Sequence, residues 1–205
     1  MGRDKCGLGQ DSYCYEGSDV LRNKLNITDG DDFDNAEEEI TQISVEGINF
    51  CAPPYNLDYL CDIHRQLFGD LFDWAGELRT VDISKGTTRF CTCLRIKAEA
   101  DKLFEALAAN NFFVTYTREE LVKAAAEFYI ELNMVHPFRE GNGRTQRILF
   151  EHIIINCGYE FSLSDVDEQE WTAANIAGVD CDYKPMEEIF EQCIGDQLGG
   201  DLELK

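Results

Sequence analysis

The chain has 205 residues, 44% of them hydrophobic, which suits one domain with a real core. Its formal net charge of −22 argues against direct binding to nucleic acid, because phosphate binding favours a basic surface. No apolar run approaches the roughly 20 residues of a membrane span, and the N-terminus lacks the apolar stretch of a secretory signal. We therefore expect a cytoplasmic protein with no membrane contact.

The first part of the chain predicts an irregular arm followed by helices. Residues 1–17 are rich in glycine and polar residues, and a helical pattern begins over 18–25. An acidic turn over 30–34 precedes a helix with an acidic face over 36–48, which the Pro53-Pro54 pair ends.

The middle of the chain changes its hydrophobic period twice. Apolar residues recur every three or four positions from 57 to 71, which indicates an amphipathic helix. Short β-leaning segments around a Lys-Gly turn predict a small hairpin over 79–93, and a helical pattern returns over 96–110. A capping box over 117–120 then opens a helix that stops at Pro137.

The last part of the chain predicts three more helices. A largely buried helix covers 145–156, with Gly158 as its stop, and two others cover 168–177 and 186–194. The polar tail from Gly195 is predicted to be frayed.

The whole pattern predicts an all-α fold, a compact helical bundle with one short β-hairpin. We divide it into an N-terminal arm at 1–17, a single domain at 18–194 and a C-terminal tail at 195–205. The chain has nine cysteines without a C-x-x-C pair, which favours reduced, mostly structural thiols over a zinc site or a disulfide framework.

One loop concentrates chemistry: H-P-F-R-E-G-N-G-R-T-Q-R, which begins at His136. It lies between two predicted core helices, and its glycines lead into the second. Free backbone N–H groups, the positive end of the helix dipole and a glycine-rich nest together make an anion site. Gly141, Asn142 and Gly143 bring these amides within reach of an anion.

The charged residues of this loop predict a polyphosphate site. Arg144 and Arg147 are three positions apart, which places both on one helix face, and guanidinium groups match phosphate oxygens. Glu140 is a lone carboxylate of the kind that holds Mg²⁺ beside phosphates. His136 is the side chain here that can accept a proton near neutral pH. Each feature alone is common in a structural loop; together they favour attack of a hydroxyl on a nucleotide phosphorus.

The loop resembles the signature of the Fic (filamentation induced by cAMP) family, H-P-F-x-[DE]-G-N-G-R-x-x-R, at every fixed position. Residues 13–27 and 64–79 are also similar to segments of bacterial members of that family. The resemblance implies the Fic fold and transfer of AMP from ATP to a Ser, Thr or Tyr hydroxyl of a target protein.

The resemblance also implies a role for each matched residue. These are His136 as the base, Glu140 as the Mg²⁺ ligand, Asn142 with Gly141 and Gly143 as the phosphate cradle, Arg144 for the β-phosphate and Arg147 for the γ-phosphate. A hairpin flap clamps the target by strand pairing in this family. Its counterpart here comprises Lys85, Gly86, Thr87, Thr88, Arg89 and Phe90. His64 and His152 lie outside the matched motifs and are interpreted as structural.

Regulation and targets follow from the same resemblance. Many Fic proteins carry an inhibitory helix, [ST]-x-x-x-E-[GN], whose Glu pairs with the second motif arginine. Its literal match here, at residues 12–17, does not read as a helix, so we expect a separate small antitoxin to supply that Glu to Arg147. Some antitoxin-regulated members modify type II topoisomerases, which makes these enzymes a candidate target.

Three other functions remain open at this point. Transfer of UMP or of phosphocholine is compatible with the loop, because the pocket for the base is not legible from sequence. A partner-binding module without catalysis is the third, although it would need neither His136 nor Glu140. Phosphate transfer, as in the Doc branch, goes with a loop altered near G-N-G and is disfavoured by Gly141, Gly143 and Arg144.

Overall fold

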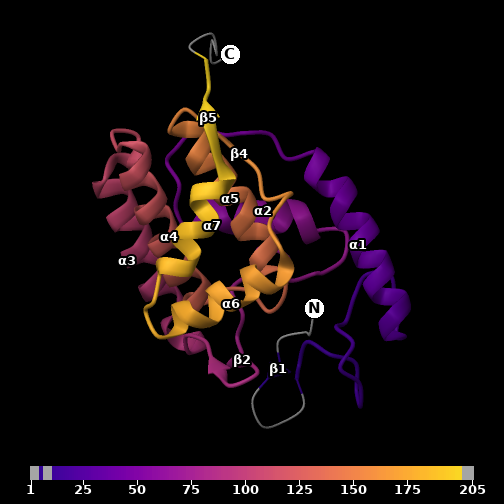
Figure 1. Cartoon of the computed structure of the whole chain (residues 1–205). Coiled ribbons are helices and arrows are strands. Elements are labelled where there is room, and N and C mark those ends of the chain that lie inside the picture. The colour runs from indigo at the N-terminus through magenta and orange to yellow at the C-terminus, as the bar shows by residue number, and fades with distance from the viewer. Residues whose placement is uncertain (1–4, 7–10, 200–205) are drawn as a thin grey trace.

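The computed structural model describes residues 5–6 and 11–199, and within them helices dominate (Figure 1). The helices are α1 (Gly30–Glu46), α2 (Leu57–Phe68), α3 (Ile96–Ala109), α4 (Arg118–Val135), α5 (Asn142–Asn156), α6 (Glu168–Val179) and α7 (Lys184–Cys193). The strands are β1 (Lys5–Cys6), β2 (Ile83–Lys85), β3 (Thr88–Arg89), β4 (Tyr159–Phe161) and β5 (Ile194–Gln197). The prediction of a helical bundle with a short hairpin is confirmed.

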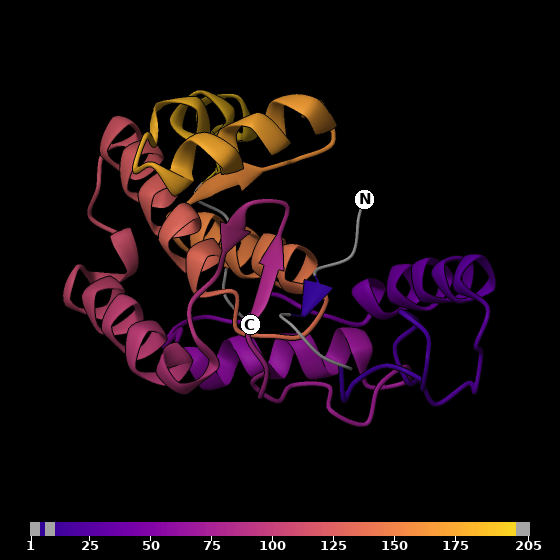
Figure 2. The ribbon, with the colours of Figure 1, turned by 90° about the horizontal axis from the view of Figure 1, so that it is seen from below.

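Helices α4 and α5 form the centre of the bundle, and the other core helices pack around them (Figures 1 and 2). Tyr129 of α4 shows how closely the elements meet. Its ring centroid lies 5.2 Å from that of Phe150 in α5, 5.1 Å from that of Trp171 in α6 and 5.9 Å from that of Phe190 in α7. A single buried aromatic side chain therefore joins four helices.

Local sequence signals set both ends of the central helix pair. The Thr117 hydroxyl oxygen accepts a hydrogen bond from the Glu120 amide, and the Glu120 carboxylate accepts one from the Thr117 amide, so the predicted capping box is confirmed. Helix α4 ends at Val135; its C-cap His136 has a left-handed φ of 47°, and Pro137 prevents continuation of the helix. The chain reverses through the next residues and enters α5 at Gly141.

The hairpin is part of a three-stranded sheet. β2 and β3 pair with Ser84 opposite Arg89 and Lys85 opposite Thr88, which leaves a two-residue turn at its tip. β1 pairs antiparallel with the other edge of β2, so the strand order is β1-β2-β3. The predicted irregular arm at 1–17 therefore contributes a strand, while residues 1–4 and 7–10 lie outside the described part.

The helix predicted over 18–25 is wrong. Cys14 and Leu21 form an antiparallel bridge instead, and the amide of Arg22 donates to the Tyr13 carbonyl at 2.8 Å. Gly17, with a φ of 72°, lies in the turn between these arms. Val20 and Leu21 are still buried, because a folded-back chain can direct them to the core as well, whereas Leu25 is exposed.

The second element also begins earlier than predicted. Residues 30–34, expected as a turn, form the first turn of α1, because the Asp29 side chain accepts from the amides of Asp31 and Asp32. The frayed tail predicted from Gly195 is wrong in its first residues: β5 pairs with β4, and the amide of Leu198 donates to the Gly158 carbonyl at 2.8 Å.

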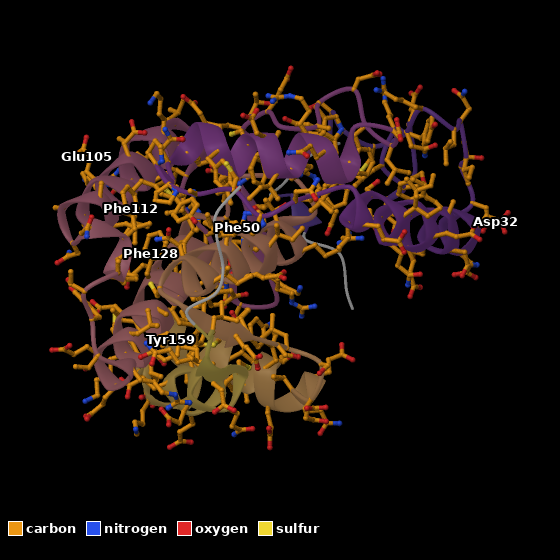
Figure 3. The ribbon with its side chains drawn as sticks, turned by 90° about the horizontal axis from the view of Figure 1, so that it is seen from above. Asp32, Phe50, Glu105, Phe112, Phe128 and Tyr159 are labelled. Carbon is orange, nitrogen blue, oxygen red and sulfur yellow. The ribbon has the colours of Figure 1, made fainter. Side chains whose placement is uncertain are left out.

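Helix α1 stands at the side of the molecule. Figure 2 shows it beyond the end of α5, on the side away from α3 and α4. In Figure 3, Asp32 in its first turn lies at the opposite extremity from Glu105 of α3. Within residues 5–6 and 11–199, no helix is both long and apolar enough to cross a membrane.

Candidate active site

The loop between α4 and α5 holds a helix N-terminus open to a ligand. Helix α5 has no side-chain hydrogen bond at its N-cap, Gly141, so the amides of its first turn are left for another acceptor. Gly141 has a φ of 81°, and a Cβ there would lie 2.4 Å from the Phe68 ring, so only glycine fits. A Cβ at Gly143 would meet nothing within 4 Å, which leaves room over the amides.

The Asn142 side chain shapes this loop from within. It is 2% exposed, its Oδ1 accepts from the Phe138 amide at 2.8 Å, and its Nδ2 donates to the Phe138 carbonyl at 2.8 Å. Phe138 itself is fully buried. Because both polar groups of the Asn142 side chain bond the loop, its part in a phosphate cradle is reduced to its backbone amide.

His136 is a buried imidazole with a defined tautomer. Its Nδ1 lies 3.0 Å from the Asn133 carbonyl oxygen, and a carbonyl only accepts, so Nδ1 carries the proton in the neutral ring. Nε2 is then the basic nitrogen. The ring stacks on Phe90 with centroids 3.8 Å apart and planes at 12°, which fixes its orientation.

The buried Arg79 ties the hairpin to this histidine. Its guanidinium donates to the carbonyls of His136 at 2.8 Å, of Val81 at 2.7 Å and of Cys91 at 2.5 Å. Val81 and Cys91 flank the two strands of the flap. The Arg79 side chain therefore holds both ends of the flap and also the backbone of His136. Phe90, predicted within the flap, lies at its foot against His136 and not at its tip.

Glu140 is positioned by a second histidine that sequence patterns did not assign to the site. The Gly76 amide donates to Nδ1 of His64 at 2.8 Å, so Nε2 carries the proton and donates to the Glu140 carbonyl at 3.0 Å. Burial lowers the pKa of His64 to about 4, which keeps this ring neutral. His64 also stacks on Phe138, with centroids 3.9 Å apart.

The donor set at the loop suits a metal held mainly by phosphate. Nowhere in residues 5–6 and 11–199 do three or more His, Cys, Asp or Glu side chains cluster as metal ligands. A single carboxylate beside phosphates is the arrangement that Mg²⁺ tolerates, since that ion keeps several waters. Glu140 meets this requirement, and its Oε1 accepts from the Gly141 amide at 3.1 Å beside the helix N-terminus.

The two helix arginines lie against different neighbours. Arg144 donates to Glu37 of α1 at 2.5 Å and to Thr41 of α1 at 3.2 Å. Arg147 is exposed, and its guanidinium carbon lies 5.2 Å from the centroid of the Trp171 ring in α6. The predicted single basic face is thus divided between α1 and α6.

Arg147 also lines a cavity of about 310 Å³ with Leu163, Val166, Glu168 and Trp171.

The third arginine of the loop has a different role. Arg139 is buried and forms an ion pair with Asp11, with Nη2 and Oδ2 2.7 Å apart, which anchors the N-terminal segment to the loop.

Comparison with known proteins places this site in a family. Residues 54–154 match the model of the Fic/DOC family. The "Probable protein adenylyltransferase Fic" of Escherichia coli strain K12 is 37% identical over 193 residues, covering 94% of this chain and 96% of the relative. The chain belongs to the Fic/DOC family. The Fic motif is the loop from His136 to Arg147.

Solved Fic structures agree with the fold. The BepC protein of Bartonella tribocorum with bound AMPPNP superposes with a TM-score of 0.82 at 27% identity, covering 90% of this chain and 97% of that one. A Fic domain from Bartonella quintana with bound ADP gives a TM-score of 0.84 at 30% identity, covering 90% and 95%. Proteins similar to this chain therefore bind adenine nucleotides on the same fold.

Several residues that build the Fic site carry no motif of their own. His64 and Arg79 are the two ends of the 64–79 stretch that resembles the family, so a signal existed without indicating their roles. Glu37 and Thr41 lie about 100 residues before the arginine that they bind, and no local pattern links them to it. Residues 12–17, the match to the inhibitory motif, contain no helix, and Glu16 is exposed.

Proposed function

We propose that this chain is a protein adenylyltransferase, which transfers AMP from ATP to a Ser, Thr or Tyr hydroxyl of a target protein. The observation that carries the proposal is the geometry of His136. Its Nδ1 proton is directed to the Asn133 carbonyl, so Nε2 is the basic nitrogen, in a loop that leads into the uncapped N-terminus of α5. The names of the curated relatives support the same reaction.

In this reaction His136 takes the proton of the target hydroxyl as its oxygen attacks the α-phosphorus of ATP. The bond between that phosphorus and the oxygen bridging to the β-phosphate breaks, and pyrophosphate leaves with the electron pair. The first-turn amides of α5 hold the phosphate oxygens, with Arg144 at the β-phosphate and Arg147 at the γ-phosphate. Mg²⁺, held by Glu140, would neutralise phosphate charge when bound.

The sheet order indicates where a target segment would pair. β1 covers one edge of β2, and within the described residues no strand pairs with the outer edge of β3. We therefore place the extended target segment along Thr88 and Arg89, by addition of a strand. Phe90 directly follows this edge and touches His136, so a paired segment would enter in a fixed relation to the base. Type II topoisomerases are the target class to test first.

The surroundings of Arg147 support control by a separate antitoxin. This guanidinium is exposed beside a cavity that Glu168 and Trp171 also line, and the 12–17 match to the inhibitory motif is not helical. A small partner could insert a glutamate there and pair with Arg147. Co-expression with small proteins that carry the [ST]-x-x-x-E-[GN] motif, followed by purification, checks this proposal. We expect a complex that Arg147→Ala weakens, and a complex indifferent to that change would contradict it.

Label transfer tests the proposed reaction. Lysate proteins are incubated with the chain, Mg²⁺ and ATP labelled at the α-phosphorus, and protein-bound label is measured. We expect a labelled target with the wild type, none with His136→Ala, and retention with His152→Gln, a buried histidine away from the loop. Label from ATP marked at the γ-phosphorus, or from UTP alone, would indicate phosphate or UMP transfer, and label that survives His136→Ala would refute the assigned base.

A further inference from the structure

Helix α1 buries a stripe that is mostly polar. Its three buried residues, Phe33, Glu37 and Thr41, are spaced by four and lie on one face. Phe33 anchors the helix against Phe72, with ring centroids 5.9 Å apart. A surface helix normally buries apolar side chains along such a stripe, and a glutamate is rarely buried without a partner. The two polar positions therefore have a purpose other than hydrophobic packing.

That partner is Arg144 of the Fic motif. The Thr41 hydroxyl donates its single hydrogen to the Glu37 carbonyl at 2.7 Å, so its oxygen accepts from Nη1 of Arg144 at 3.2 Å. Oε1 of Glu37 accepts from Nη2 at 2.5 Å. The guanidinium carbon also lies 4.8 Å from the centroid of the Phe68 ring. Two hydrogen bonds and an aromatic face fix the plane of this group.

These contacts can persist while Arg144 holds a phosphate. A guanidinium has five N–H groups, and α1 takes two of them. The Glu37 side chain is only 10% exposed, so withdrawing the arginine would leave a poorly hydrated carboxylate without its partner. A bound polyphosphate therefore meets an arginine that stays on α1 and offers its remaining N–H groups.

We propose that Glu37 and Thr41 are positioning residues that orient Arg144 toward the leaving pyrophosphate. The inference rests on the proposed adenylyl transfer. Negative charge grows on the pyrophosphate as the bond to the α-phosphorus breaks, and a pre-oriented donor stabilises that charge more than it stabilises bound ATP. The pair therefore acts on kcat and much less on nucleotide affinity.

Single substitutions on α1 separate positioning from simple support. Thr41→Val keeps the shape and removes the acceptor, Glu37→Ala removes the carboxylate, and Glu39→Ala on the exposed face is the matched control. We expect kcat for label transfer to fall roughly 10- to 100-fold in the first two variants, because misplacing a catalytic group costs about this much. Affinity for ADP, measured by calorimetry, should change by less than about threefold. Thr41→Ser keeps the hydroxyl that accepts from Arg144, so it should retain the wild-type kcat.

Two results would overturn the inference. An unchanged kcat in both Thr41→Val and Glu37→Ala, with the fold intact by circular dichroism, would show that α1 does not position Arg144. A parallel loss of ADP affinity and kcat would show that α1 only supports the site. Absence of any label transfer by the wild type would instead refute the proposed function. Failure of the positioning role differs from this, because the wild type would then transfer label while the α1 variants showed an unchanged kcat or a parallel loss of ADP affinity.

Discussion

The Fic loop has two sides that are built differently. On the α1–α2 side, Arg144 is held by two side chains of α1 and by Phe68, and Gly141 is pressed against the same ring. On the α6 side, Arg147 touches the Trp171 ring beside a cavity, and a side chain at Gly143 would meet open space. On the α1–α2 side, the orientation of Arg144 is fixed before a ligand binds. On the α6 side, Arg147 has room to change its orientation when a ligand binds.

This contrast agrees with the roles proposed for the two arginines. The β-phosphate is part of the leaving group, so its arginine gains from a fixed orientation. The γ-phosphate site is the one expected to exchange ATP for an antitoxin glutamate, so an exposed and adjustable Arg147 suits it.

Alanine substitutions at Gly141 and Gly143 should change the free energy of unfolding in opposite directions. Gly141→Ala should lower the free energy of unfolding by about 2 to 5 kcal/mol, because left-handed backbone and overlap with Phe68 both carry a cost. Gly143→Ala should raise it by up to about 1 kcal/mol, as expected for a helical position without a clash. Urea unfolding measures both.

Gly143→Ala should also show that stability and ADP binding can change in opposite directions. The added methyl at Gly143 enters the space over the first-turn amides, so calorimetry should show weaker ADP binding in the more stable protein. Equal destabilisation by both substitutions would contradict the division of the loop into a packed side and an open side.

His64 should make the packed side sensitive to acid. Its folded pKa of about 4 lies below the unfolded value of 6.5, so the stability that its neutral form supports is complete above pH 6.5 and is lost as the pH falls toward 4. A difference of this size corresponds to roughly 3 kcal/mol. His64→Gln should remove this part of the pH dependence.

Urea unfolding of the two proteins between pH 7.5 and about 4 isolates this effect, because other titrating groups are shared. His152, whose pKa burial also lowers, remains in both and serves as an internal reference. An identical pH dependence in wild type and His64→Gln would show that folding does not depend on the neutral ring, whose Nδ1 accepts from the Gly76 amide.

Alanine substitutions at Arg144 and Arg147 should change the free energy of unfolding by smaller but measurably different amounts. Arg144→Ala should lower the free energy of unfolding by about 1 to 3 kcal/mol, because it leaves the buried Glu37 without its partner. Arg147→Ala should cost less than about 1 kcal/mol, the usual range of an exposed contact between a cation and an aromatic ring. Adding Glu37→Ala to Arg144→Ala should recover part of the loss, and purely additive effects would exclude the pair as a coupled unit.

The motif and the local helix signals were readable in the sequence because they depend on neighbours in the chain. The capping box at Thr117 needs only Glu120, and Pro137 with Gly141 sets the loop between two helices. The catalytic candidates follow, since His136, Glu140, Arg144 and Arg147 occur within twelve residues. The helix predicted over 18–25 failed because burial of Val20 and Leu21 does not distinguish a helix from a folded-back chain.

What surrounds the loop was decided by the tertiary structure. Pairing of β5 with β4, of β1 with the flap and of Glu37 with Arg144 joins segments distant in the chain, and such contacts leave no local period. The same is true of Arg79 and His64, whose hydrogen bonds to loop carbonyls form only when α2, the flap and the motif meet. The sequence alone thus determined which groups can do the chemistry, and packing determined how each is oriented, because orientation depends on neighbours that only folding brings together.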